Sequence, residues 1–351
     1  MGKIALAVIG AGSIGAKHAE LVNSHTGCRL VGIADSDPSR KSIADRFGVP
    51  FCASVEELLR RQRPAGVIIA TPNATHANVS LTCAEHGVHM LVEKPIADTV
   101  NAARRIVGAG KKHGVRILVG HHRRHNPLVQ TTRELIRQGA LGKLVTVSVF
   151  WLILKPDDYF ATSWRREPPG GGPLLINLIH DLDILRFVCG DVVSVYARTS
   201  AQARDFDVED SLSISLRFAN GALGTVLASD AVAAPWSYEA TTGENSMYFR
   251  TTENCCHFTG SAGSLAFPKM EMWRYADARQ PGWTQPLERT QVPVGRRDPL
   301  TVQLEHFRRV VIGEEPPVID AEEATRSLAL VHAVKTSGAT GNAVEPATLL
   351  R

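Results

Sequence analysis

The segment GGGPLLINLIHDLDIL, residues 170–185, joins three glycines to an apolar run that contains four polar side chains: Asn177, His180, Asp181 and Asp183. A histidine in this setting can act as a general base, because its free pKa of about 6.5 lets it take up and release a proton near neutrality. The segment alone leaves three interpretations open. It is a helix with a catalytic base, a metal site, or an amphipathic helix whose polar edge faces outward.

The two aspartates of this segment are expected to have structural roles. Asp181 directly follows His180, and Asp183 lies three residues after it. We expect both to form structural hydrogen bonds or to pair with Arg186. A metal ion between His180 and Asp183 would lack further acidic or histidine ligands nearby, so we predict no metal site.

A second candidate site follows the first predicted strand. IGAGSIGAKH places Gly10, Gly12 and Gly15 in a G-x-G-x-x-G pattern, where glycines allow a tight turn and let backbone N–H groups approach a pyrophosphate. Asp35 ends the next strand, 20 positions beyond Gly15, where a carboxylate accepts the ribose 2′-hydroxyl. Because this carboxylate would repel a 2′-phosphate, we predict NAD in preference to NADP, although Arg40 lies nearby.

Predicted strands and helices, which must position these residues, alternate over the first 120 positions, as in a parallel sheet covered by helices. Predicted strands are Ile4–Ile9, Leu30–Ala34, Gly66–Ala70, His89–Val92 and Arg116–Val119, and predicted helices are Ile14–Ser24, Arg40–Phe47, Val55–Arg61, Ala74–His86 and Val100–His113. The fold class is therefore α/β, with an N-terminal dinucleotide-binding domain at residues 1–123.

Beyond about residue 125 the pattern changes to long strands, and we predict a C-terminal α+β domain at residues 124–351 with a large, mostly antiparallel, open sheet. Its predicted elements are helix Leu128–Gln138, strands Leu144–Leu154, Val192–Thr199, Asp210–Phe218 and Ala222–Ser229, and helices Thr301–Ile312 and Ala321–Ser337. Asn220-Gly221 predicts a hairpin. Asp320, with Glu323 three residues on, fits the start of the last helix, which could pack back on the first domain.

Composition excludes several classes of protein. The 351 residues are 44% hydrophobic and 21% charged, and the net charge of +4 is too small to indicate a nucleic-acid or membrane partner. No apolar run approaches the roughly 20 residues that span a bilayer. The apolar N-terminus is short, glycine-interrupted and without a cleavage pattern, so we expect no signal peptide and a cytoplasmic location. Six scattered cysteines without a C-x-x-C pair are expected to be free and buried.

The glycine pattern, ADSDPSR, ATPNATH, the triplet Glu93-Lys94-Pro95, the glycine-rich approach to His180 and the ending AVKTSGATG together resemble the Gfo/Idh/MocA oxidoreductases, nearly end to end. The resemblance implies a Rossmann domain followed by an α/β domain with a large sheet. It implies Lys94 as the active-site lysine and His180 as the proton-transferring histidine. The cofactor contacts that we expect are Gly10, Gly12, Ser13, Ile14, Gly15, Asp35, Arg40, Thr71, Pro72, Asn73, His76, Glu93 and Lys94.

One position departs from the family pattern. Members commonly have an aspartate four residues before the histidine, where this chain has Ile176. Asn177 is polar and three residues before His180, so it shares the histidine's helical face and is a candidate substrate ligand. The departure leaves open the substrate and the balance of charge at the lysine–histidine pair.

Two further segments offer substrate ligands. GHHRRHNP, residues 120–127, follows the last predicted Rossmann strand and presents Arg123 and His122, while its arginines would repel a metal ion. YFATSWRREPPGGG presents Trp164, which could stack on a sugar face, and Arg165, which could bind a carboxylate. We expect Arg123, Trp164 and Arg165 to bind substrate.

These residues predict an NAD-dependent dehydrogenase that oxidises a ring secondary hydroxyl of a sugar or cyclitol, with His180 as base and Lys94 as electrostatic stabiliser. The alternative is the same chemistry on a carboxylated cyclic cis-dihydrodiol. An alternative of another class is a non-catalytic NAD-binding regulator, which would have no need of the lysine and histidine. The half-exposed sheet, through which relatives associate, predicts a homodimer or homotetramer.

Overall fold

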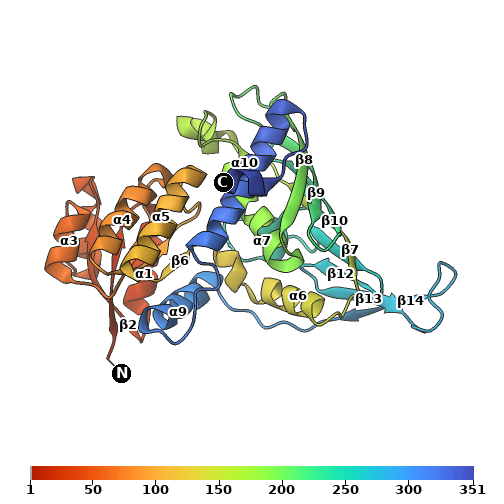
Figure 1. The fold of residues 1–351 in the computed structure, drawn as a ribbon, viewed down its shortest axis with the longest axis horizontal. Coiled ribbons are helices and arrows are strands. Elements are labelled where there is room, and N and C mark those ends of the chain that lie inside the picture. The colour runs from red at the N-terminus through yellow and green to blue at the C-terminus, as the bar shows by residue number, and fades with distance from the viewer. Residues whose placement is uncertain (1) are drawn as a thin grey trace. The chain divides into compact units, whose positions relative to one another are not determined.

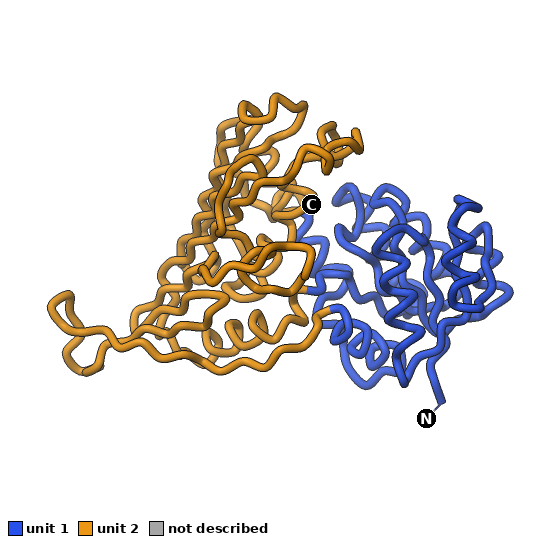
Figure 2. Tube along the Cα trace, turned by 180° about the vertical axis from the view of Figure 1, so that it is seen from behind, with its two compact units in different colours: residues 1–122, 300–328 blue, residues 123–299, 329–351 orange. Residues whose placement is uncertain are grey.

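The computed structural model describes residues 2–351. It forms two compact units (Figure 2). Unit 1 contains the chain up to His122 together with Leu300–Leu328, and unit 2 contains Arg123–Pro299 and Ala329–Arg351. The contacts thus group Leu300–Leu328 with unit 1, whereas the predicted division assigns this segment to the second domain and allows the C-terminal helix to pack back on the first.

Unit 1 contains a parallel six-stranded sheet in the order β3-β2-β1-β4-β5-β6 (Figure 1). Its strands are β1 (Ile4–Ile9), β2 (Cys28–Ala34), β3 (Phe51–Cys52), β4 (Gly66–Ile69), β5 (His89–Val92) and β6 (Ile117–Val119). The central strands are almost wholly buried, as expected of a parallel sheet covered by helices. The predicted Rossmann fold is confirmed.

The helices of unit 1 are α1 (Ser13–Ser24), α2 (Lys41–Phe47), α3 (Val55–Gln62), α4 (His76–Glu85), α5 (Val100–His113) and α9 (Pro299–Ile312). Side chains cap two of them: Ser54 accepts from the Glu57 amide at the start of α3, and Thr99 accepts from the Ala102 amide at the start of α5. In α9, Phe307 is completely buried in the core of unit 1, which explains why this helix groups with it.

Unit 2 contains an eight-stranded sheet in the order β14-β13-β12-β11-β7-β10-β9-β8. The strands are β7 (Leu144–Leu152), β8 (Val192–Ser200), β9 (Ser211–Phe218), β10 (Leu223–Ser229), β11 (Cys256–Gly260), β12 (Ser264–Phe267), β13 (Glu271–Tyr275) and β14 (Leu287–Gln291). β10 pairs with β7 in parallel and with β9 in antiparallel, through the predicted Asn220-Gly221 hairpin. The mostly antiparallel sheet is confirmed, whereas β11 to β14 were not predicted.

The helices of unit 2 are α6 (Pro127–Arg137), α7 (Ile179–Cys189), α8 (Tyr238–Thr242) and the second part of α10 (Ala321–Thr340), and a π-helical turn, Leu174–Leu178, leads directly into α7. The predicted end of α10 at Ser337 is wrong: the helix continues to Thr340 and is followed by Gly341 with φ +69°. Along β9, buried and exposed residues alternate, so one face of the sheet is open. No helix within residues 2–351 has both the length and the apolar character needed to cross a membrane.

Candidate functional site

The glycine turn of unit 1 lies where the strand order of the sheet reverses, at the carboxyl ends of β1 and β4. Gly10 has φ +91°, and a Cβ there would lie 2.6 Å from the backbone that directly follows β4. A Cβ on Gly15 would lie 1.8 Å from the carbonyl oxygen of Gly10. Gly12, the N-cap of α1, has open space instead, and Ser13 and Ile14 beside it are exposed. The turn therefore leaves room for a phosphate at the N-terminus of the helix.

Asp35 follows β2 at the same edge of the sheet. Its carboxylate accepts hydrogen bonds from the backbone amides of Ala11, at 2.6 Å, and Asp37, at 2.9 Å, which fix it beside the glycine turn. Arg40 is exposed and pairs with Asp37 at 3.5 Å. A fixed carboxylate next to an open glycine turn fits a dinucleotide that has a free ribose 2′-hydroxyl.

The turn Thr71–Asn73 follows β4, and Pro72 and Asn73 are exposed there. His76, at the start of α4, is completely buried: its Nδ1 lies 2.9 Å from the Pro95 carbonyl oxygen and its Nε2 lies 2.8 Å from the Thr71 carbonyl oxygen. Burial lowers the pKa of His76. The ring thus connects the turn to the segment after Lys94, which supports a positioning role for His76.

Glu93 and Lys94 follow β5. Glu93 is buried, and its Oε1 lies 2.7 Å from His18 Nε2 in α1, while its Oε2 accepts from the backbone amide of Lys94 at 3.2 Å. Burial raises the pKa of Glu93, but the hydrogen bond and charge of His18, with the charges of His122 and Lys94, lower it to about 2. Lys94 remains half-buried. Glu93 therefore supports the lysine from inside the unit.

Glu93→Gln tests this buried carboxylate through the pH dependence of stability. Because the folded-state pKa, about 2, lies below the ordinary value of 4.5, the charge of Glu93 stabilises the fold above about pH 5 and ceases to do so as the pH falls to about 2. The difference corresponds to roughly 3 kcal/mol. We expect the wild type to lose about this much more unfolding free energy than Glu93→Gln over that interval, as measured by urea unfolding; parallel pH profiles would contradict the assignment.

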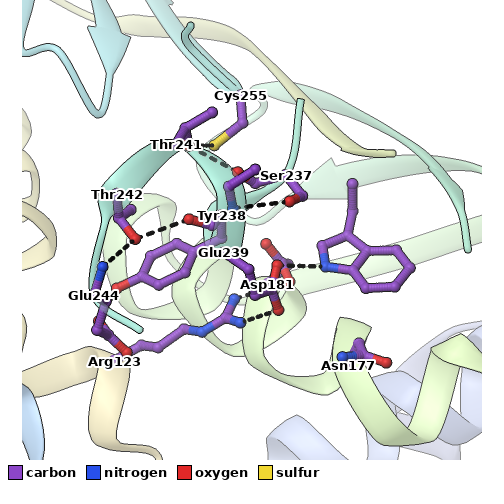
Figure 3. A network of polar contacts seen from close by, with 12 residues as sticks. Arg123, Asn177, Asp181, Ser237, Tyr238, Glu239, Thr241, Thr242, Glu244 and Cys255 are labelled. Atoms are coloured by element: carbon purple, nitrogen blue, oxygen red, sulfur yellow. Dashed lines mark hydrogen bonds and ion pairs between the residues drawn. The ribbon is translucent and has the colours of Figure 1, made fainter. Parts of the chain in front are cut away.

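In unit 2, Arg123 and Arg124 bind the two acids that follow His180. Figure 3 shows Arg123 with Asp181 and Glu239. Arg123 donates to Asp181 at 3.1 Å and to Glu239 at 2.6 Å, and its guanidinium stacks 3.8 Å from the ring centre of Tyr238. Burial raises the pKa of Asp181 to about 7, against the opposing charge of Arg123. Arg123 is itself buried, so the contacts support a structural role for it in place of the expected substrate contact.

Arg124 binds the second acid of α7. Its Nε and Nη2 donate to the two carboxylate oxygens of Asp183 at 2.8 and 2.7 Å, and both side chains are buried. Arg186, the partner that the sequence suggested, donates to Asp191 at 2.5 Å. Asp181 and Asp183 thus fix α7 to the segment before α6, as their expected structural role requires.

Arg123→Met is expected to destabilise the protein by about 3–5 kcal/mol, because it leaves two carboxylates buried without their cation. The measurement is the midpoint and free energy of chemical unfolding. Arg137→Met, which removes an exposed pair with Glu134, is the matched control and should leave the midpoint unchanged. An Arg123→Met protein as stable as the control variant would show that the buried network contributes nothing.

His180 lies in the first turn of α7 and is 7% exposed. Gly172 has φ +84°, and a Cβ there would collide with the carboxylate of Glu209, which accepts from the Leu174 amide at 3.0 Å. The chain therefore approaches Glu209 closely, and this contact holds the start of the π-helical turn.

Asn177 lies in that turn, and the structure adds a partner that the sequence analysis missed. The Nζ of Lys155 donates to Asn177 Oδ1 at 2.8 Å and lies 3.4 Å from Asp230 Oδ2. Burial lowers the pKa of Lys155, with Asp230 opposing. A signal was present in the sequence: LILKP, like LVEKP, places a lysine and a proline directly after an apolar strand.

Trp164 and Arg165 lie in a 3₁₀ turn, Ser163–Arg165. Trp164 is 51% exposed. Arg165 donates to the Tyr159 carbonyl oxygen at 2.6 Å, and its guanidinium stacks 4.0 Å from the centre of the Tyr159 ring. Trp164 thus has a surface that a ligand could cover, whereas the contacts of Arg165 hold this segment together.

Two family models match the chain. The model described as "Oxidoreductase family, NAD-binding Rossmann fold" matches residues 4–121, and the one described as "GFO/IDH/MocA C-terminal domain" matches residues 129–266. Both matches agree with the elements described above.

Individual proteins are also similar to this chain. An inositol 2-dehydrogenase from Rubrobacter xylanophilus is 32% identical over 231 residues, which cover 64% of each protein, less than two thirds of that relative. A 1,5-anhydro-D-fructose reductase from Ensifer adhaerens is 30% identical over 300 residues, 83% of each. The WlbA dehydrogenase from Bordetella pertussis, solved with NADH and UDP-GlcNAcA, has a TM-score of 0.80 at 24% identity over 98% of each chain, so the fold is shared.

Proposed function

Because the chain belongs to the Gfo/Idh/MocA family of NAD-binding oxidoreductases, we propose that it is a dehydrogenase that oxidises a ring secondary hydroxyl of a sugar or cyclitol to the ketone or lactone. The observation that supports this most is the position of Lys94. It is half-buried at the carboxyl end of the sheet, the edge that also presents the glycine turn and Asp35, and the Glu93–His18 pair supports it from within.

In this proposal one side chain takes up a proton and another stabilises negative charge. Oxidation of the carbinol removes a hydride from carbon and a proton from the hydroxyl, and NAD, when bound, would supply the acceptor of the hydride. The His180 imidazole takes the hydroxyl proton. The Lys94 ammonium stabilises the negative charge that develops on the same oxygen. Asn177 and Trp164 contact the substrate, and the networks around Asp181 and Asp183 hold the histidine's helix in place.

The cofactor that we propose is NAD. The backbone amides of the glycine turn and the first turn of α1 would bind its pyrophosphate, and Asp35 would accept a ribose hydroxyl. The carboxylate of Asp35 disfavours the 2′-phosphate of NADP. The turn Thr71–Asn73 and the Glu93–Lys94 segment lie at the same edge of the sheet and would border the nicotinamide end.

For partners and location we propose a cytoplasmic homodimer or homotetramer that acts on a small molecule, without nucleic acid or membrane. The support for association is the open face of the unit 2 sheet, where Leu223 and Leu227 of β10 are 56% and 45% exposed. Exposed apolar side chains on a sheet are typical of a protein–protein contact.

A carboxylated cyclic cis-dihydrodiol is the second candidate substrate. The observation that favours it is the buried ammonium of Lys155 beside Asn177, together with Ile176 where relatives have an acid. Fewer acids at this turn would favour an anionic substrate.

A substrate panel tests the proposal. Initial rates of NAD and NADP reduction are measured with inositols, aldoses and carboxylated dihydrodiols. We expect reduction of NAD in preference to NADP by a member of the first two classes. Turnover of the carboxylated diols alone would support the second candidate, and NAD binding without reduction by any of the three classes would overturn the proposal in favour of a regulator.

A further inference from the structure

We propose that Lys155 is a positioning residue of the substrate site: it holds the side-chain amide of Asn177 so that the amide's NH₂ group is the part presented to substrate. The inference rests on the proposed function, since it assigns a substrate contact to Asn177. The inference also states which kind of substrate atom the Asn177 amide binds, namely an oxygen that accepts a hydrogen bond.

The orientation of Asn177 follows from the chemistry of its partner. An ammonium group donates hydrogen bonds and accepts none. The Lys155 Nζ, 2.8 Å away, therefore faces the oxygen of the Asn177 amide and not its nitrogen. With the oxygen engaged, both N–H bonds of the amide point away from the lysine.

Lys155 is itself fixed by the residues around it. Its Nζ lies 3.4 Å from the Asp230 carboxylate, and its backbone amide donates to the Asp230 carbonyl oxygen at 2.9 Å. The Nζ also lies 4.6 Å from the ring centre of Tyr159 and 5.5 Å from that of Trp151. Lys155 is only 8% exposed, and burying its ammonium costs free energy, which these contacts offset. The result is a rigid donor opposite Asn177.

Asp230 does not depend on Lys155 alone. Arg204 donates from its Nε to the other carboxylate oxygen at 2.9 Å, and its side chain is also buried. Removal of the lysine's charge therefore leaves Asp230 with a cation. Lys155 can therefore be substituted without leaving a buried carboxylate unpaired, whereas substitution of Arg123 would leave two.

The position of Asn177 in the chain indicates which substrate group its amide contacts. It lies in the π-helical turn directly before α7, three residues before His180, and π-helical turns are frequent at functional sites. The neighbouring Ile176 offers no polar group. A carboxylate in this turn would accept a hydrogen bond from a substrate hydroxyl, whereas the fixed Asn177 amide donates. The turn thus selects an acceptor oxygen near the reacting carbon, such as the ring oxygen of a pyranose or a carboxylate.

A double-mutant cycle tests whether Lys155 acts through Asn177. Lys155→Met, Asn177→Leu and the double variant are compared in kcat and KM with the best substrate of the panel, and NAD affinity is measured by titration. We expect each single variant to lose about 10-fold in kcat/KM, mainly through KM, which is the range of one hydrogen bond to substrate. The double variant should lose no more than Asn177→Leu alone, within about 2-fold. Lys143→Met, an exposed lysine of the same unit, is the control and should match the wild type.

Asn177→Asp provides a second test that leaves Lys155 in place. Its carboxylate still accepts from Lys155 but has no N–H to donate, so it should lose about as much kcat/KM as Asn177→Leu while its unfolding midpoint stays at or above that of the wild type. If Lys155→Met fails to fold, the comparison of Asn177→Asp with Asn177→Leu and the wild type is sufficient to test the inference. Additive losses in the cycle, or Asn177→Asp with wild-type kcat/KM, would overturn the inference and leave the proposed function standing. A wild type without NAD-dependent turnover would overturn the proposed function and this inference with it.

Discussion

Replacement of Lys94 with alanine is expected to lower kcat by about 100- to 1,000-fold while the affinity for NAD stays within about 3-fold of the wild type. The reason is that, in the proposed mechanism, the ammonium stabilises charge on the reacting oxygen, whereas the glycine turn and Asp35 are proposed to bind the nucleotide through other contacts. Steady-state kinetics give kcat, and a fluorescence titration with NADH gives the affinity.

Lys112→Ala is the matched control for Lys94→Ala, because Lys112 is an exposed lysine of α5 in the same unit. It should behave as the wild type in both measurements. Comparable turnover by Lys94→Ala and Lys112→Ala would rule out the assignment of Lys94. A loss of NAD binding equal to the loss of turnover would show that Lys94 binds the cofactor and does not act on the substrate.

The second large effect is expected at His180. Glutamine retains hydrogen-bonding capacity but cannot accept a proton near neutrality, so His180→Gln should lower kcat by about 100- to 10,000-fold, the usual range for loss of a general base. His257→Gln, a partly exposed histidine on β11, is the control. A His180→Gln enzyme with the turnover of that control would contradict a catalytic role.

Because Lys94 and His180 are proposed to act on one oxygen, their effects should not multiply. The double variant should have a kcat close to that of the slower single variant, as is found for groups that act as a unit. Losses that multiply fully would show that the two side chains act independently of each other.

Local patterns were sufficient to predict the fold of unit 1. The spacing of Gly10, Gly12 and Gly15 and the alternation of short apolar runs with helices predicted five of its six strands to within about two residues, and only the two-residue β3 was missed. The four strands from β11 to β14 were missed, and β14 is exposed along its whole length, so no alternation of buried and exposed residues marks it. Such strands depend on pairing with a distant neighbour, as β11 does with β7.

In the candidate site, too, residues in local motifs could be predicted, whereas contacts between residues far apart in the sequence could not. Residues at strand ends and helix starts, such as Lys94 and His180, could be proposed from motifs. Their partners could not, because Arg123 binds Asp181 and Glu239 at separations of 58 and 116 residues. In the sequence Arg123 therefore looks like a free cation available to a substrate, although two buried carboxylates bind it in the fold.

The most direct test of the proposed activity is a tracer measurement of hydride transfer. The substrate from the panel is deuterated at the carbinol carbon and incubated with the enzyme and NAD. We predict a primary isotope effect on kcat/KM in the Lys94→Ala enzyme, in which chemistry is slow, and deuterium at C4 of the nicotinamide in the wild-type product. NAD bound by the protein, with no deuterium transferred from any sugar, cyclitol or dihydrodiol, would contradict the account.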